Sequence, residues 1–208
     1  MFSYKNIIVV ISSPSGTGKT SIIREVIKRD DNLRFSISAT TREPRANEVD
    51  GEHYHFIARE EFTDRIHSND FLEYATVFGN YYGTPMNEIE RNFKEKHDII
   101  MDVDWQGARQ ITARVKKSEL IKIFILPPSL EELRIRLKNR NTDSKISIAR
   151  RMDEAKNEIK HSKEYDYVVV NDNFERVIDD VRSLILAKKI GNTIKSEVRN
   201  FIAKLCSC

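Results

Sequence analysis

The chain has 208 residues, 39% of them hydrophobic and 32% charged, which suits a globular protein with one hydrophobic core and inserted lobes. The formal net charge of +3 is too small to indicate a nucleic-acid partner. Cys206 and Cys208 provide no disulfide framework, and the apolar run at residues 7–11 is too short for a signal peptide or a membrane span, so we expect a cytoplasmic protein with no membrane partner.

The first predicted elements are a strand, a glycine-containing turn and a helix. Residues 7–11 are β-branched and apolar, as in a strand buried on both faces, and the apolar positions of residues 21–28 have helical spacing. The turn between them is similar to the phosphate-binding motif G-x-x-x-x-G-K-[ST], with a serine in place of the first glycine. Such a loop binds ATP phosphates through backbone N–H groups. The predicted ATP-binding residues here are Ser13, Pro14, Ser15, Gly16, Thr17, Gly18, Lys19 and Thr20.

Two side chains of this loop have specific expected roles. Lys19 would reach the β- and γ-phosphates, and the Thr20 hydroxyl would be a ligand of Mg²⁺. The alternative is a chance Gly-x-Gly turn between a strand and a helix, which the Lys-Thr pair after the second glycine argues against.

The next region is rich in strand and aromatic signals. Alternation at residues 33–38 predicts a half-buried strand, and the polar stretch 39–51, broken by Pro and Gly, predicts a loop. We expect strands at 54–57 and 71–78, a helix at 60–68 between them, and a turn at 79–84. Because strands and helices do not alternate here as in a nucleotide-binding core, we interpret the region as an inserted lobe.

The chain then alternates between helices and strands. Helices are predicted at 85–96, after 104, at 129–139, 146–161 and 174–190, and buried strands at 97–104, 121–126 and 167–170. This order predicts an α/β fold with a parallel sheet core and helices on both faces. Ligands then bind beyond the carboxyl ends of the strands, where polar clusters occur at 13–20, 102–104 and 171–173. Residues 191–208 form a tail to which we assign no role.

Two carboxylates end the strand at 97–104. Asp102 and Asp104 are suited to holding Mg²⁺, directly or through water, beside the phosphates. They could equally solubilise the strand end or cap the next helix. The phosphate loop elsewhere in the chain favours the functional interpretation.

Arginines occur in two further places. Arg42 and Arg45, with Tyr54 and Tyr82, could bind an anion, although a solvated basic loop is the commoner fate of such arginines. Four further arginines lie on two predicted helices joined by a polar turn: Arg136, Arg140, Arg150 and Arg151. These helices could form a lid that brings cations to a phosphoryl group, or their arginines could be surface charge, with Glu132 pairing with Arg136. The histidines have no metal-binding spacing, and no Ser-His-Asp or Cys-His arrangement is evident.

The chain resembles the guanylate kinase family from about residue 7 to residue 185. The matching segments, in chain order, are 12–20 (SSPSGTGKT), 40–45 (TTREPR), 48–51 (EVDG), 54–56 (YHF), 71–75 (FLEYA), 79–84 (GNYYGT), 102–107 (DVDWQG), 127–129 (PPS) and 170–172 (VND). Each segment is modest evidence, but all of them in this order are highly specific.

The resemblance implies a P-loop nucleoside-monophosphate kinase fold of three parts. These are a nucleotide-binding core (5–36, 90–127 and 161–190), a GMP-binding lobe (37–89) and a helical lid (128–160). The implied reaction transfers the γ-phosphate of ATP to GMP, and we expect to dGMP, giving ADP and GDP in purine nucleotide metabolism and GMP recycling. The implied cofactor is Mg²⁺, with Thr20 and Asp102 as its expected protein ligands. The expected partners are ATP and GMP, without nucleic acid, and the oligomeric state is left open.

The resemblance also implies roles for individual residues. The expected GMP-binding residues are Ser38, Arg42, Arg45, Tyr54, Glu73, Tyr82, Thr84, Asp102 and Asp104. The expected catalytic residues are Lys19, Arg42, Arg136, Arg140 and Arg151, and Asn171 joins the ATP-binding set. Thr84 stands where a serine is common in the family, and the hydroxyl is retained.

The chemistry of Glu73 agrees with this expectation. Guanine presents N1–H and its N2 amino group side by side, and a carboxylate accepts both hydrogen bonds, which adenine does not offer. Two alternatives are a peptide-binding scaffold module of the same fold and a kinase for another nucleoside monophosphate. Such modules typically lose the phosphate loop, which is intact here, and Glu73 with Ser38 favours guanine.

Overall fold

A computed structural model describes residues 6–77, 79–139 and 145–193. Its larger sheet has five parallel strands in the order β2-β7-β1-β8-β9. The strands are β1 (Ile8–Ser12), β2 (Leu33–Phe35), β7 (Asp98–Asp102), β8 (Leu120–Leu126) and β9 (Tyr167–Val170). In the register, Ile8 lies opposite Ile99 on one side and Leu120 on the other. The predicted parallel α/β core is therefore confirmed.

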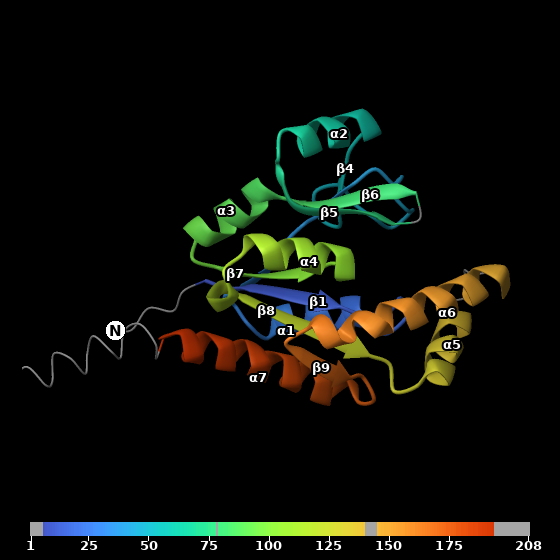
Figure 1. The fold of residues 1–208 in the computed structure, drawn as a ribbon. Helices are drawn as coiled ribbons and strands as arrows, with labels where there is room; N and C mark the ends of the chain where they lie inside the picture. The colour runs from blue at the N-terminus through green and yellow to red at the C-terminus, as the bar shows by residue number, and fades with distance from the viewer. Residues whose placement is uncertain (1–5, 78, 140–144, 194–208) are drawn as a thin grey trace, which may run out of the picture.

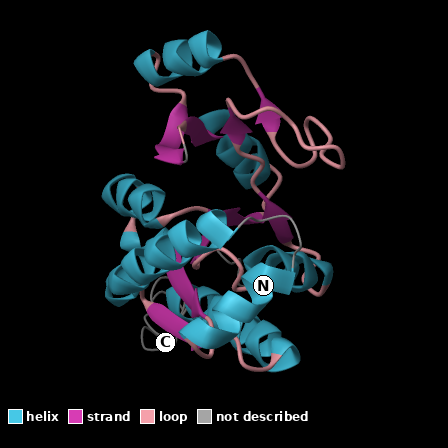
Figure 2. Ribbon diagram, turned by 90° about the vertical axis from the view of Figure 1, so that its right-hand side faces the viewer, coloured by secondary structure: helices cyan, strands magenta, loops and turns pink. Residues whose placement is uncertain are grey.

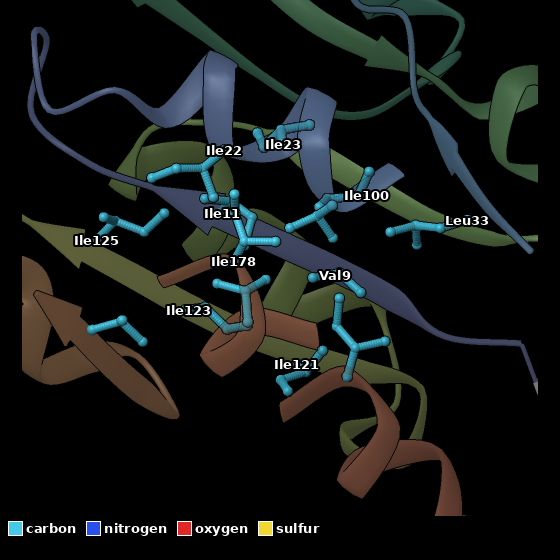
Figure 3. Close-up of a cluster of buried hydrophobic side chains, with 14 of the residues drawn as sticks. Val9, Ile11, Ile22, Ile23, Leu33, Ile100, Ile121, Ile123, Ile125 and Ile178 are labelled. Atoms are coloured by element: carbon cyan, nitrogen blue, oxygen red, sulfur yellow. The ribbon is translucent and has the colours of Figure 1, made fainter. Parts of the chain in front are cut away.

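Helices cover both faces of this sheet, which explains why β1 is apolar throughout. Val9 and Ile11 face a cluster that includes residues of α1 (Lys19–Lys28) and α7 (Phe174–Thr193), part of which Figure 3 shows. Ile8 and Val10 face the opposite cluster, with residues of α3 (Met86–Lys94) and α4 (Trp105–Arg114). Because successive side chains of a strand point to opposite faces, a strand covered on both sides needs no polar positions.

A second, mixed sheet has the order β4-β3-β6-β5 and forms the lobe at the top of Figure 1. Its strands are β3 (Ala39–Thr40), β4 (His55–Phe56), β5 (Phe71–Val77) and β6 (Asn80–Pro85). Helix α2 (Arg59–His67) packs on it through the buried ring of Phe62, which stacks on Phe71 with 4.4 Å between the ring centroids.

Two sequence predictions in this lobe were wrong. The stretch predicted as a turn at 79–84 forms most of β6, and β3 begins inside the stretch predicted as a loop. Gly83 lies within the predicted turn, but it serves close packing within a strand. A Cβ there would lie 3.0 Å from the Glu73 carbonyl oxygen and 3.0 Å from ring atoms of both Phe62 and Phe71.

Helices α5 (Leu130–Asn139) and α6 (Lys145–Lys160) extend from the core on the right of Figure 1, and Figure 2 shows the molecule from that side. The two helices pack through Leu133, Leu137, Met152 and Ala155. Ser129 caps the start of helix α5, since its Oγ accepts a hydrogen bond from the Glu132 N–H at 3.0 Å, as in a capping box. Short 3-10 helices at Lys117–Glu119 and His161–Glu164 complete the described elements. Within the described ranges no helix is long and apolar enough to cross a membrane.

Candidate functional site

The phosphate loop joins β1 to α1, as predicted. Gly16 and Gly18 have φ angles of +94° and +99°, a backbone conformation that residues with side chains rarely adopt. Gly16 also lies against α5, because a Cβ at this position would be 2.8 Å from Leu137 Cδ2. Both glycines are therefore required by the geometry of the loop. The serine at position 13, which replaces the first glycine of the motif, is accommodated in a buried position.

Side chains from later in the chain hold this loop in place. Asn171, which follows β9, donates from Nδ2 to the Thr17 carbonyl oxygen at 2.6 Å. Arg136 of α5 donates to the same carbonyl at 3.3 Å, and Arg151 of α6 donates to Ser15 Oγ at 3.2 Å. The structure thus brings two predicted lid arginines and Asn171 to the loop. Arg140, the third predicted catalytic arginine of the lid, lies outside the described residues.

Acidic side chains at the end of β7 face the loop. Lys19, the first residue of α1, forms an ion pair with Asp102, the last residue of β7. Asp104 lies beyond the strand and caps α4, where its Oδ1 accepts from the Gly107 N–H at 2.9 Å. Both carboxylates line the same cavity. Asp104 therefore has both of the roles that the sequence left open as alternatives, because it caps the helix and also lines the candidate site.

That cavity has a volume of about 630 Å³ and connects the phosphate loop to the small sheet. Of the residues predicted from the sequence, those lining it are Ser13, Pro14, Ser15, Gly16, Gly18, Lys19, Thr20, Ser38, Arg45, Tyr54, Glu73, Tyr82, Asp102, Asp104 and Arg151. Five predicted residues do not line the cavity, but each contacts either the loop or a residue that lines the cavity: Thr17, Arg42, Thr84, Arg136 and Asn171.

The predicted anion-binding side chains are adjacent to one another. Arg42 Nε donates to the Tyr82 hydroxyl at 3.2 Å, and the Arg42 guanidinium carbon lies 5.6 Å from the centre of the Tyr54 ring. Burial and the nearby Asp102 carboxylate raise the pKa of Tyr54 to about 12, so its hydroxyl remains a hydrogen-bond donor at neutral pH. Arg42 also donates from Nη2 to both carboxylate oxygens of Glu48 at 2.9 Å. Glu48 therefore orients Arg42 and partly neutralises it.

Glu73 projects from β5 into the cavity and is only 4% exposed. Its Oε1 accepts a hydrogen bond from the hydroxyl of Thr84, on the paired strand β6, at 2.7 Å. Burial raises the pKa of Glu73 to about 7 despite that hydrogen bond, and the neighbouring Asp104 charge adds to the rise. A ligand that offers two hydrogen-bond donors to this carboxylate would stabilise its ionised form.

Sequence reasoning missed Glu158, the fourth carboxylate that lines the cavity, after Glu73, Asp102 and Asp104. It lies on α6 seven residues after Arg151, so both project from one face of the helix, a spacing that could have identified it. Burial raises its pKa to about 7, against the opposing effect of Lys19. Its Oε2 atom is inaccessible to solvent and has no hydrogen-bond partner within the described part of the chain.

The oxygen donors at the loop fit a metal ion that is shared with a substrate. No group of three or more His, Cys, Asp or Glu side chains suited to holding a metal occurs among the described residues. The exposed Thr20 and the Asp102 carboxylate nevertheless line the cavity beside the loop. Mg²⁺ keeps several waters and is commonly bound by one or two protein oxygens together with substrate phosphates, so these two residues suit it.

Comparisons with known proteins agree with this geometry. Residues 5–188 match the sequence profile of the guanylate kinase family. A guanylate kinase of Rickettsia prowazekii (strain Madrid E) is 47% identical over 191 residues, which are 92% of this chain and 96% of that protein. One of Vibrio parahaemolyticus is 48% identical over 188 residues, covering 89% and 90% of the two chains. The crystal structure of guanylate kinase from Anaplasma phagocytophilum superposes with a TM-score of 0.75 at 32% identity, over 95% of this chain and 98% of that one.

Proposed function

This chain belongs to the guanylate kinase family of enzymes, and we propose that it transfers the γ-phosphate of ATP to GMP and dGMP, giving ADP and GDP or dGDP. The observation that carries the proposal is the single cavity that joins the phosphate loop to Glu73. A phosphate donor held at the loop and a base held at Glu73 would meet within it. The product would feed the recycling of guanine nucleotides.

The acceptor would be bound at two points of the small sheet. Its phosphate would lie against Arg45, Tyr54 and Tyr82, with Arg42 supporting Tyr82 through the hydrogen bond described above. Arginine forks suit phosphate oxygens, and tyrosine hydroxyls donate without adding charge. Its guanine base would donate N1–H and N2–H to Glu73, close to the Ser38 hydroxyl. This recognition makes no use of the ribose 2′-hydroxyl, which is why the proposal includes dGMP.

The chemistry needs no general base. The GMP phosphate oxygen is already anionic at neutral pH, so catalysis consists of positioning and charge neutralisation. Lys19 would leave Asp102 to bind the β- and γ-phosphates, and Arg136 and Arg151, which donate hydrogen bonds to the loop, would neutralise the transferred group. We include Arg140 in this set by family resemblance alone. Thr20 and Asp102 would hold Mg²⁺, which neutralises phosphate charge when bound.

The proposal also assigns the parts of the chain. Residues 5–36, 90–127 and 161–190 would form the nucleotide-binding core, residues 37–89 the GMP-binding lobe, and residues 128–160 a lid. Closure of the lid and the lobe over the cavity would exclude water from the phosphoryl group and prevent its hydrolysis.

A coupled assay of ADP formation tests the proposal. It uses ATP and Mg²⁺ with GMP, dGMP, AMP, UMP or CMP as the acceptor. We expect turnover with GMP and dGMP, and values of kcat/KM for the other three that are lower by about 10⁴ or more, as for a site built around hydrogen bonds to one base. Comparable turnover with AMP would refute guanine specificity. An absence of acceptor-dependent turnover would refute the kinase proposal itself.

A further inference from the structure

We propose that Gly107 is a positioning residue for guanine recognition, because the absence of a side chain there leaves the space that the Glu73 carboxylate occupies. A Cβ at position 107 would lie 2.5 Å from Glu73 Oε2 and 3.1 Å from Glu73 Cδ. The first of these distances is shorter than real Cβ contacts reach. The inference rests on the proposed function, in which Glu73 binds the base.

The backbone of Gly107 gives no other reason for a glycine. The residue lies in the first turn of α4, and its φ angle is outside the left-handed region that favours glycine. At a helical position alanine is the more stable choice, since glycine loses more backbone freedom on folding. The close approach of Glu73, with Val103 Cβ next at 3.3 Å, therefore explains the glycine, and the helical conformation does not.

The carboxylate of Glu73 is confined from two sides. Thr84 Oγ1 donates to Oε1 at 2.7 Å, and the first turn of α4 lies against Oε2. Asp104 holds this first helical turn in place, because its side chain accepts a hydrogen bond from the Gly107 N–H at 2.9 Å. Two neighbours from different elements thus define one orientation of a carboxylate that is almost fully buried.

The strand that carries Glu73 cannot easily move away from the helix. Gln110 of α4 makes two hydrogen bonds with the backbone of Tyr74, of 2.6 and 3.1 Å, and Arg114 donates to the Leu72 carbonyl oxygen at 3.0 Å. These bonds tie β5 to α4 on both sides of Glu73. A methyl group at position 107 would consequently displace the Glu73 side chain, while both backbones stay in place.

Displacement of this carboxylate would act on one substrate only. The paired hydrogen bonds to guanine require both oxygens in one plane with the base, and a misplacement of about 1 Å can cost a hundredfold in rate. The ATP phosphates would bind at the loop, and the three atoms nearest to a Cβ at position 107 belong to Glu73 and Val103, not to the loop. Gly107→Ala should therefore raise KM for GMP while leaving KM for ATP unchanged, a split that a general loss of stability would not produce.

The experiment is a double-mutant cycle on the full chain, with Gly107→Ala, Glu73→Asp and the double variant. Each single change should lower kcat/KM for GMP by about tenfold or more. The shorter aspartate withdraws from the space beside position 107, so the double variant should lose much less than the product of the two single effects. Gly191→Ala is the matched control, because a Cβ at this exposed position of α7 would meet nothing within 4 Å.

Two results would overturn the inference: wild-type kinetics in Gly107→Ala, or independent, multiplicative effects in the cycle. If Gly107→Ala does not fold, Glu73→Ala/Gly107→Ala should fold as well as Glu73→Ala, and failure of that double variant would locate the clash elsewhere. Glu73→Gln separates the two proposals. If it retains the preference for GMP over AMP, the proposed role of Glu73 fails. If it loses that preference while Gly107→Ala keeps it, only the role of Gly107 fails.

Discussion

Lys19, at the start of α1, is paired with Asp102, at the end of β7. The pair lies beside the phosphate loop, in the cavity where ATP phosphates are proposed to bind. The loop lysine is therefore held in place by a carboxylate before any phosphate arrives. An incoming phosphate must compete with Asp102 for the Lys19 ammonium group.

This competition predicts that Asp102→Asn strengthens the binding of metal-free ATP. The lost pair is partly exposed and corresponds to about 1 kcal/mol, or about fivefold in Kd. Calorimetric titration with ATP in EDTA measures the effect. Asp153→Asn removes a carboxylate from an exposed site of α6 and controls for net charge. Unchanged or weaker binding by Asp102→Asn alone would show that the pair does not oppose phosphate binding.

Lys19→Ala should lower kcat by a factor of about 10² to 10³, because one preorganised donor to the transferring phosphates is removed. GMP binding should be unchanged, since the proposed GMP contacts lie on the strands of the small sheet and in the segments that join them. Single-turnover kinetics and GMP titration measure the two quantities separately. Near-normal turnover would remove Lys19 from the mechanism.

The pKa of Glu73 predicts a pH dependence of GMP use. The free enzyme holds this carboxyl with a pKa of about 7, well above its ordinary value of 4.5, so it is largely protonated below pH 7 and cannot accept both guanine donors. The value of kcat/KM for GMP should fall about tenfold per unit as the pH decreases below 7. The phosphate of GMP titrates in a similar pH range, and this titration affects the kinetics of wild type and Glu73→Gln in the same way. The ratio of wild type to Glu73→Gln should therefore fall with decreasing pH, and a constant ratio contradicts the prediction.

A buried ion pair far from the site predicts a stability effect. The Asp98 side chain is 1% exposed and accepts hydrogen bonds from the Ile7 N–H and Asn32 Nδ2, both at 2.9 Å, and it pairs with Lys189 of α7 at 2.5 Å. Lys189→Met leaves this charge buried without its cation and should lower the free energy of unfolding by about 3 kcal/mol. Urea unfolding measures it, with the exposed Lys28→Met as control. A change in the free energy of unfolding below about 0.5 kcal/mol would mean that the ion pair with Lys189 does not stabilise the buried Asp98 side chain.

The core of the fold could be predicted because its signals are local. The apolar run before Gly16 and the helical spacing after Lys19 identify β1, the loop and α1 without further information. The small sheet was less predictable, because the meaning of Gly83 depends on Phe62 and Phe71, which reach it only in the folded chain. A glycine that permits close packing looks the same in a sequence as a glycine that permits a turn.

The candidate site also has a part that the sequence predicts and a part that it does not. Lys19, Glu73 and Asp102 were identified from the sequence, and the structure brings all three to one cavity. The sequence did not reveal that Glu48 holds Arg42 or that Asn171 holds the Thr17 carbonyl. All four residues lie in segments that match the family, but a match does not say which of these segments contact one another. Their partners are set by the tertiary fold, which pattern reasoning does not resolve.

The most direct test of the account is the acceptor preference of Glu73→Gln, measured as the ratio of kcat/KM for GMP to that for AMP. A glutamine presents an N–H₂ group where guanine needs a second acceptor, so one of the two proposed hydrogen bonds is replaced by a repulsion between donors. We predict that the ratio falls at least about a hundredfold relative to wild type, with KM for ATP unchanged. A ratio equal to that of the wild type would contradict the claim that Glu73 reads guanine in this cavity.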